Sequence, residues 1–258
     1  MGYSLEEEMH GYNFIEYAEL GKPRYLILGL PDAGIIGPIV ASHMVKSLGM
    51  KDVIGIESYT YIPPAAIIKE GSIKYPMRIY VKDDISVLVT DISPVPSGIV
   101  PLASAIVEFA RKRGFEYLIG ISGIGNPSRA EIEKPNVYWL ATTHDSSKLV
   151  EKISSEVKLF PDGIIVGPYA VILKESAKRR VNSLLLLADA FIEIPDPEAA
   201  AEITKVISKI INVEIDVSQL LQEAETLRLR LQGLAKETKN TLARVGKGYE
   251  YRTPLIYS

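Results

Sequence analysis

Apolar residues in the first three quarters of the chain follow two alternating patterns. Short runs of continuous apolar residues, such as PRYLILGL and ISVLVTD, predict buried β-strands. Segments whose apolar residues recur every three or four positions predict helices, as in 33–48 and 100–113. Further strands are expected in DVIGIES, FEYLIGIS, NVYWLATT and NSLLLLADA, and further helices over 168–180 and 197–211.

This alternation predicts the fold class. Strands alternating with helices favour a mostly parallel sheet with helices on both faces, a three-layer α/β domain. The segment AAIIKEGSIKYPMRIYVKDD departs from the alternation, because two strand-like runs surround Glu70 and Gly71, and it predicts a β-hairpin. We expect the α/β core domain to occupy residues 1–212, with His10 in a mobile start.

A different pattern begins near residue 213. From 217 to 243, apolar positions lie alternately four and three residues apart, with charges between them. This heptad seam consists of Leu220, Ala224, Leu227, Leu231 and Leu234, followed by Thr238 and Thr241. The helix could pack along its own domain or join the subunits of an oligomer, and the pattern does not choose between the two. Residues 213–245 are therefore predicted to be a helical segment. Residues 246–258, with glycines and a proline, are predicted to be a flexible tail.

Composition narrows the functional class. The 258 residues include 29 Lys and Arg against 32 Asp and Glu, so there is no basic field for nucleic acid or an anionic membrane. No apolar run approaches the ~20 residues of a membrane span. With 0 cysteines, a disulfide framework and a thiolate zinc site are excluded, and the acidic start is unlike a signal peptide. We expect a cytoplasmic protein whose partner is neither nucleic acid nor membrane.

The most conspicuous candidate for ligand chemistry is the turn GLPDAGIIG, residues 29–37. A strand-to-helix turn can present N–H groups to phosphate, which makes Asp32, Gly34 and Gly37 candidate ligand residues, with Asp91 at the end of ISVLVTD. The turn lacks the Lys-Ser or Lys-Thr of a phosphate loop, and its glycines do not fit the dinucleotide fingerprint. The favoured interpretation is structural: Asp32 caps the turn, and Gly37 permits close packing of helix on strand.

The other candidates do not combine into a catalytic group. Ser122 lies in GISGIG, a broken form of the Gly-x-Ser-x-Gly elbow, and His43 is expected to pack within its helix. In THDSS, Asp145, after His144, is expected to cap a helix. The three histidines do not show metal-ligand spacing. We therefore assign no catalytic residue, cofactor or metal.

Several ordered motifs resemble the proteasome-assembly chaperone family, in particular its archaeal homologues, some of which carry a label likening them to ATP-dependent carboligases. The motifs are GLPDAGIIGPIVASHMVKSLGMKDVIGIES, YIPPAAIIKEGSIKYPMRIYV, VLVTDISPVPSG and YLIGISGIG. The resemblance implies a nucleoside-phosphorylase-like α/β fold without that enzyme's catalytic residues. It also implies a role in binding the α-subunits of the proteasome.

The final residues suggest the same partner. Leu255, Ile256, Tyr257 and Ser258 resemble the hydrophobic–tyrosine–any-residue (HbYX) ending of proteasome activators and some assembly chaperones. A carboxylate at Ser258 can pair with a lysine between adjacent α-subunits, while the tyrosine ring buries apolar area and Ile256 fills the mouth of the pocket. The alternative is that these residues fold back onto their own core.

The leading hypothesis is thus an ATP-independent homo-oligomer, without catalysis, that offers several tails to the ring of proteasome α-subunits. One alternative is a small-molecule or nucleotide-binding enzyme that uses the turn Gly29–Gly37, and another is a scaffold whose seam binds some other helix. A phosphate or nucleotide site at 31–34 would favour the enzyme, whereas an apolar-lined cleft would favour the binding protein. The sequence leaves the subunit number open and does not separate assembly from activation.

Overall fold

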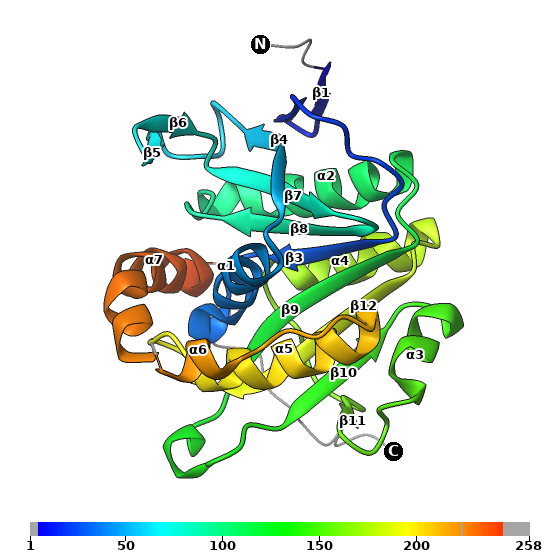
Figure 1. Ribbon diagram of the computed structural model, residues 1–258, viewed down its shortest axis with the longest axis vertical. Coiled ribbons are helices and arrows are strands. Elements are labelled where there is room, and N and C mark those ends of the chain that lie inside the picture. Colours follow the sequence, from blue (N-terminus) through cyan, green and yellow to red (C-terminus); the bar gives the residue numbers. More distant parts are fainter. Residues whose placement is uncertain (1–4, 223, 245–258) are drawn as a thin grey trace.

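The computed structural model describes residues 5–222 and 224–244, which surround one large central sheet (Figure 1). Its strands follow the order β1-β2-β4-β7-β8-β3-β9-β12-β10-β11. A separate hairpin is formed by β5 and β6. The strand bounds are β1 Leu5–Met9, β2 Tyr12–Glu16, β3 Tyr25–Gly29, β4 Lys51–Glu57, β5 Ile67–Lys69, β6 Ser72–Lys74, β7 Met77–Lys82, β8 Ile85–Thr90, β9 Tyr117–Gly125, β10 Val137–Ala141, β11 Lys158–Leu159 and β12 Ser183–Ala190.

Helices cover both faces of this sheet (Figure 1). One face carries α1 (Ile36–Leu48), α3 (His144–Glu151) and α5 (Pro197–Ile211), and the other carries α2 (Ile99–Lys112) and α4 (Pro168–Arg179). Side chains alternate between the faces along each strand, so Ile27 belongs to the core under α1, whereas Leu26 and Leu28 belong to the core under α2. The predicted α/β class is confirmed. Short 3₁₀ segments are η1 Ala33–Ile35, η2 Pro96–Gly98 and η3 Arg129–Glu131.

The sheet is mixed, so the expectation of a mostly parallel sheet is wrong. The strands β8, β3, β9 and β12 run parallel in the centre. The strands β1, β2, β4, β7 and β8 pair antiparallel with their neighbours in that order, and β10 is antiparallel to β12. Tight turns explain part of the difference. The turn after β7 contains Asp83 at φ +54°, and a loop this short can join only antiparallel neighbours.

The first described residues form a hairpin that the sequence did not predict. β1 and β2 pair through a turn in which His10 and Gly11 both have positive φ, 52° and 78°. The imidazole Nε2 of His10 lies 3.0 Å from Oε2 of Glu108 on α2. From Leu5 onward, the expectation of a mobile start is therefore wrong. The segment LEEEM lacks the apolar pattern of a strand because β1 lies at the edge of the sheet. Acidic side chains on an edge strand discourage pairing with other chains.

The cap of α3 also differs from the prediction. Thr143 is the N-cap: its Oγ1 accepts a hydrogen bond from the N–H of Ser146, and its own N–H donates to Ser146 Oγ, both at 3.1 Å. Asp145 lies inside the first turn, where it pairs with Lys148. A capping box satisfies two free N–H groups at once, so Thr143 takes the place that the sequence analysis gave to Asp145.

The C-terminal helices α6 (Ser218–Gln222) and α7 (Ala224–Arg244) lie beside α1 and α5 (Figure 1). Leu220 is buried in the core beneath α1 and α5, and Leu231 and Leu234 pack against the same core while partly exposed. Ala224 is half-buried. The side chain of Leu227 lies outside the described part of the chain, and so does the whole predicted tail. The division into 1–212, 213–245 and 246–258 stays a prediction, as do contacts between subunits.

Candidate functional site

The carboxyl ends of β8, β3, β9 and β12 meet at one edge of the sheet, which is where α/β proteins commonly bind ligands. The turn η1 follows β3 at this edge, and Asp91 follows β8. Helix α7 contacts both η1 and η2 here. We therefore take this edge as the candidate site and α7 as its cover.

Asp32 stabilises the turn after β3. Its Oδ1 accepts the N–H of Ala33 at 2.9 Å, and its Oδ2 accepts the hydroxyl of Ser122 at 2.5 Å, so the predicted cap is confirmed. Ser122 lies inside β9 with no exposed surface. Tyr169 of α4 donates its hydroxyl to the carbonyl of Leu28, and its pKa is raised first by burial and then by the charge of Asp32. Asp32, Ser122 and Tyr169 are therefore buried and bonded within the fold.

The two glycines of the turn act through geometry. Gly34 has φ +67°, and a Cβ there would lie 3.1 Å from Cβ of Ala190. At Gly37 a Cβ would lie 2.6 Å from the carbonyl oxygen of Leu30, which no side chain can tolerate without movement of the backbone. The predicted close packing of helix on strand at Gly37 is therefore confirmed.

The space between this turn and α7 is small and apolar. A cavity of about 20 Å³ is lined by residues that include Leu30, Pro31, Ile99, Leu102 and Thr238. One water occupies ~10–15 Å³ on this measure, and ligand pockets span ~300–1,000 Å³. Thr238 of α7 lies over the edge, with its Oγ1 2.9 Å from Oγ of Ser93. The cleft at this turn is thus lined mainly by apolar side chains and is much smaller than a ligand pocket.

Asp91 belongs to a separate network. Its Oδ2 lies 2.5 Å from Nη2 of Arg78, whose side chain has no exposed surface, and 3.2 Å from Nζ of Lys69 on β5. Burial alone lowers the pKa of Arg78, but the Asp91 charge and the Tyr80 hydroxyl together raise it above its ordinary value. The guanidinium therefore stays charged, and Asp91 links the β5–β6 hairpin to the sheet.

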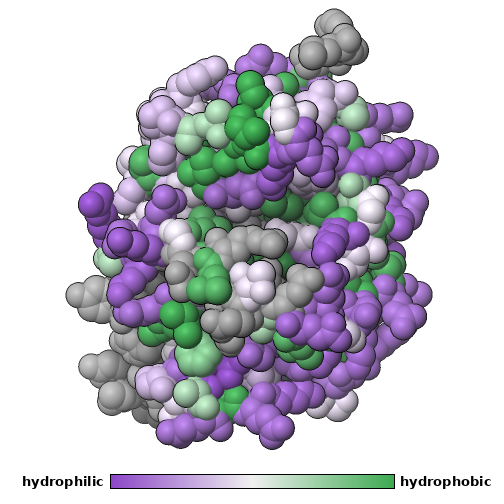
Figure 2. Space-filling model, turned by 60° about the vertical axis from the view of Figure 1, so that its left-hand side comes forward, coloured by the Kyte–Doolittle hydropathy of each residue, from purple (hydrophilic) through white to green (hydrophobic). Residues whose placement is uncertain are grey.

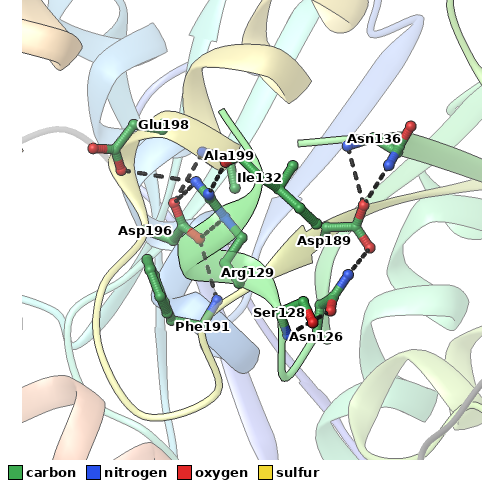
Figure 3. Close-up of polar contacts among 10 residues, drawn as sticks. All are labelled: Asn126, Ser128, Arg129, Ile132, Asn136, Asp189, Phe191, Asp196, Glu198 and Ala199. Atoms are coloured by element: carbon green, nitrogen blue, oxygen red, sulfur yellow. Dashed lines mark hydrogen bonds and ion pairs between the residues drawn. The ribbon is translucent and has the colours of Figure 1, made fainter. Parts of the chain in front are cut away.

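A third network, which the sequence analysis missed, lies beyond β9 and β12 (Figure 3). Arg129 makes two parallel contacts with Asp196, Nε to Oδ2 at 2.7 Å and Nη2 to Oδ1 at 2.8 Å. Asp196 has no exposed surface, and its Oδ1 also accepts the N–H of Ala199 as the cap of α5. Asp196-Pro197 directly before a predicted helix was the available sequence signal.

Asp189 closes the other half of the same network (Figure 3). Its Oδ1 accepts a hydrogen bond of 3.0 Å from Nδ2 of Asn126, and its Oδ2 accepts one of 2.7 Å from Nδ2 of Asn136. These bonds tie both ends of the segment between β9 and β10 to β12. Because each carboxylate in this network is satisfied by neighbours, the arrangement is that of a structural support.

Two further observations concern the described residues, and a third concerns the predicted tail. The described residues contain no group of three or more His, Asp or Glu placed to hold a metal ion. None of their helices has the length and apolar character needed to cross a membrane. The predicted partner-binding residues Leu255, Ile256, Tyr257 and Ser258 lie outside the described part of the chain.

The model of the PAC2 family matches residues 26–235, which is most of the chain. The chain belongs to the PAC2 family. This PAC2 chain is also similar in structure to PbaA of Pyrococcus furiosus, an archaeal homolog of proteasome-assembly chaperone, with a TM-score of 0.81 and 28% sequence identity over 90% of this chain and 99% of PbaA. The family resemblance found in the motifs is therefore confirmed.

Two other relatives extend the comparison. The PAC2 chain is 25% identical to an uncharacterized protein of Methanocaldococcus jannaschii, MJ0106, over 92% of this chain and 96% of that protein. It shares its fold with PbaB of Pyrococcus furiosus, an archaeal proteasome activator, at a TM-score of 0.70 and 22% identity over 88% of this chain and 99% of PbaB.

Proposed function

We propose that this protein is a proteasome-assembly chaperone-like or activator-like protein that binds proteasome α-subunits through its C-terminal tail, without catalysis. The observation that carries the proposal is the likeness to PbaA, which extends over 90% of the chain at 28% identity. PbaA is described as a homolog of proteasome-assembly chaperone, and the tail of this chain carries residues suited to the same partner.

The tail supplies the contact. Tyr257 can bury its ring in a pocket between α-subunits while its hydroxyl bonds to a polar group there, and Ile256 adds apolar area. A carboxylate at Ser258 can form a charge-assisted bond with a lysine of the pocket. Short peptides bind weakly when single, so several tails on a homo-oligomer would gain affinity through effective concentration. The core would then serve as the carrier that presents the tails.

The core supports a role without catalysis. Asp32 and Ser122 bond to each other, Asp91 pairs with Arg78, and the cavity beneath α7 holds about 20 Å³. Among the described residues, this arrangement leaves Asp32 and Asp91 bound to structural partners, and the cavity at the turn is far smaller than the ~300–1,000 Å³ of a ligand pocket. The second candidate function, an enzyme using the turn Gly29–Gly37, gains no support from these features.

The test is co-purification of the tagged chain with isolated α-subunits and with the mature proteasome, each with and without ATP. We expect retention of α-subunits that does not depend on ATP. Retention of isolated α-subunits alone would indicate a role in assembly, and retention of the mature particle as well would indicate activation. If the chain retains neither partner in either buffer, the proposed function is wrong.

A further inference from the structure

An apolar cavity opens beside the β5–β6 hairpin and is distinct from the small cavity beneath α7. Its volume is about 380 Å³, and its walls include Tyr59, Ile62, Pro63, Ala66 and Pro76. Figure 2 shows hydrophobic residues gathered on the upper part of this face, where the hairpin lies. The large side chains left exposed here are Tyr59, Ile68 and Ile73, with 89%, 63% and 78% of their surface accessible. Such a surface is typical of a binding site.

One end of this cavity is acidic. Glu57, the last residue of β4, lines it, and Glu6 of β1 lies close enough to influence its charge. Burial raises the pKa of Glu57, and repulsion from Glu6 raises it further. Among the described residues, neither carboxylate has an ion-pair partner, whereas the nearby Lys69 and Lys74 are paired with Asp91 and Asp52. The cavity therefore suits a segment in which a cation stands beside apolar residues.

The tail of this chain contains such a segment. In Tyr251-Arg252-Thr253-Pro254-Leu255, an arginine lies between an aromatic residue and an apolar pair. A guanidinium can pair with Glu57 and stack on an exposed ring such as Tyr59, while Pro254 and Leu255 fill the apolar walls. The segment and the cavity thus match in both charge and hydrophobicity.

The distance along the chain also permits this contact. The hydroxyl of Thr238 on α7 lies within hydrogen-bond distance of the hydroxyl of Ser93. Two residues after Ser93, the N–H of Val95 donates a hydrogen bond of 2.8 Å to the carbonyl of Tyr61. Tyr61 precedes Ile62, which lines the cavity. By this route the end of α7 lies within roughly 30 Å of the cavity. The segment from 245 to 252 spans up to ~26–29 Å when extended. The straight distance from α7 to Ile62 is shorter than this route, so residues 251–255 can reach the cavity that Ile62 and Glu57 both line.

We propose that the cavity beside the β5–β6 hairpin binds residues 251–255 of the chain's own tail. The regulatory consequence of this contact rests on the proposed function. Leu255 belongs both to the segment bound in the cavity and to the residues proposed to bind the α-ring. A tail held in the cavity is therefore withheld from the α-ring. If half or more of the tails are held, releasing them tightens apparent ring affinity by about twofold or more.

The absence of native cysteines allows a direct test by disulfide crosslinking in the full chain. Thr253→Cys is combined with Ala66→Cys at the cavity or, as a matched control, with Ser154→Cys, an exposed position beyond α3. We expect mild oxidation to crosslink the first pair within one chain, with at least a fivefold higher yield than the second. Adding Glu57→Gln or Arg252→Gln should reduce that yield severalfold. Thermal melts of each variant show that the fold is kept.

Equal yields for the two pairs, or a yield unchanged by both Glu57→Gln and Arg252→Gln, would overturn the proposal. A product that runs as a dimer would also overturn it, because the occupant would then be the tail of a second copy. The crosslink needs no proteasome, so its failure leaves the proposed function standing. Conversely, a chain that fails to bind α-subunits can still show the crosslink.

Discussion

At Gly34 the turn after β3 needs a backbone that only glycine adopts freely, and it also needs space. We predict that Gly34→Ala lowers the free energy of unfolding by about 1–3 kcal/mol, because φ is +67° and the new Cβ would meet Ala190 and Asp196. The matched control is Gly49→Ala, with φ +60° and open space around the Cβ. Urea denaturation should show the larger loss for Gly34→Ala, and equal losses would contradict the role given to crowding.

A second prediction at the residue scale concerns the buried ion pair between Arg129 and Asp196. Arg129→Met removes the partner of Asp196, which has no exposed surface, so we expect a loss of about 3–5 kcal/mol. Arg24→Met is the control, since it breaks a pair with Glu116 in which both side chains are about half exposed. The two variants should differ clearly in urea midpoint. Similar midpoints would show that the Arg129 pair does not hold this region together.

The separation of two interacting residues along the sequence decides whether their roles can be predicted from the sequence. Asp32 and Gly37 were predictable because a cap and a close approach leave local signals in the turn. Arg129 was not, because its partner Asp196 lies 67 residues away and pairing at that distance leaves no local pattern. Asp91 was located correctly at the end of its strand, but its partners Arg78 and Lys69 required the structure.

At the scale of elements, the sequence predicted which segments are strands and helices better than how they pair. The helix over 197–211 and the hairpin around Glu70 and Gly71 appear where the patterns place them. The direction of β4 and β10 is set by long-range packing, which the apolar runs do not encode. The strand β1 was missed because its acidic residues hide the alternation of an edge strand.

Helix α7 provides the prediction for this scale. Leu234 packs against the core beneath α1 and α5, so we expect Leu234→Ala to cost about 1–2 kcal/mol and to lower the melting temperature by several degrees. Leu229→Ala is the matched control, because that side chain is 61% exposed. Light scattering run beside the melt reports whether the mass of the protein in solution also changes. Equal melting temperatures for the two variants would contradict the packing of α7 on its own core.

At the scale of the whole molecule, the described residues form a core in which the buried acids Asp32, Asp189 and Asp196 are bound to neighbours, with helix α7 over one edge of the sheet. We propose that the tail carries the contact residues. Sequence motifs alone indicated the family, because they are ordered along most of the core, and the PAC2 match confirms it. They could not give the conformation of the tail, because a segment that binds a partner, as we propose for this one, takes its conformation from that partner. The account therefore rests most heavily on the tail.

The most direct test is the affinity of the full chain for immobilised proteasome α-rings, measured for the parent, Tyr257→Ala and Tyr249→Ala. Tyr249 is a matched control, an aromatic residue of the same tail outside both proposed binding segments. We predict that Tyr257→Ala loses ~2 kcal/mol, about 30-fold in Kd, while Tyr249→Ala binds like the parent and all three melt alike. The account is contradicted if Tyr257→Ala binds as tightly as the parent, or if its weaker binding is matched by a lower melting temperature.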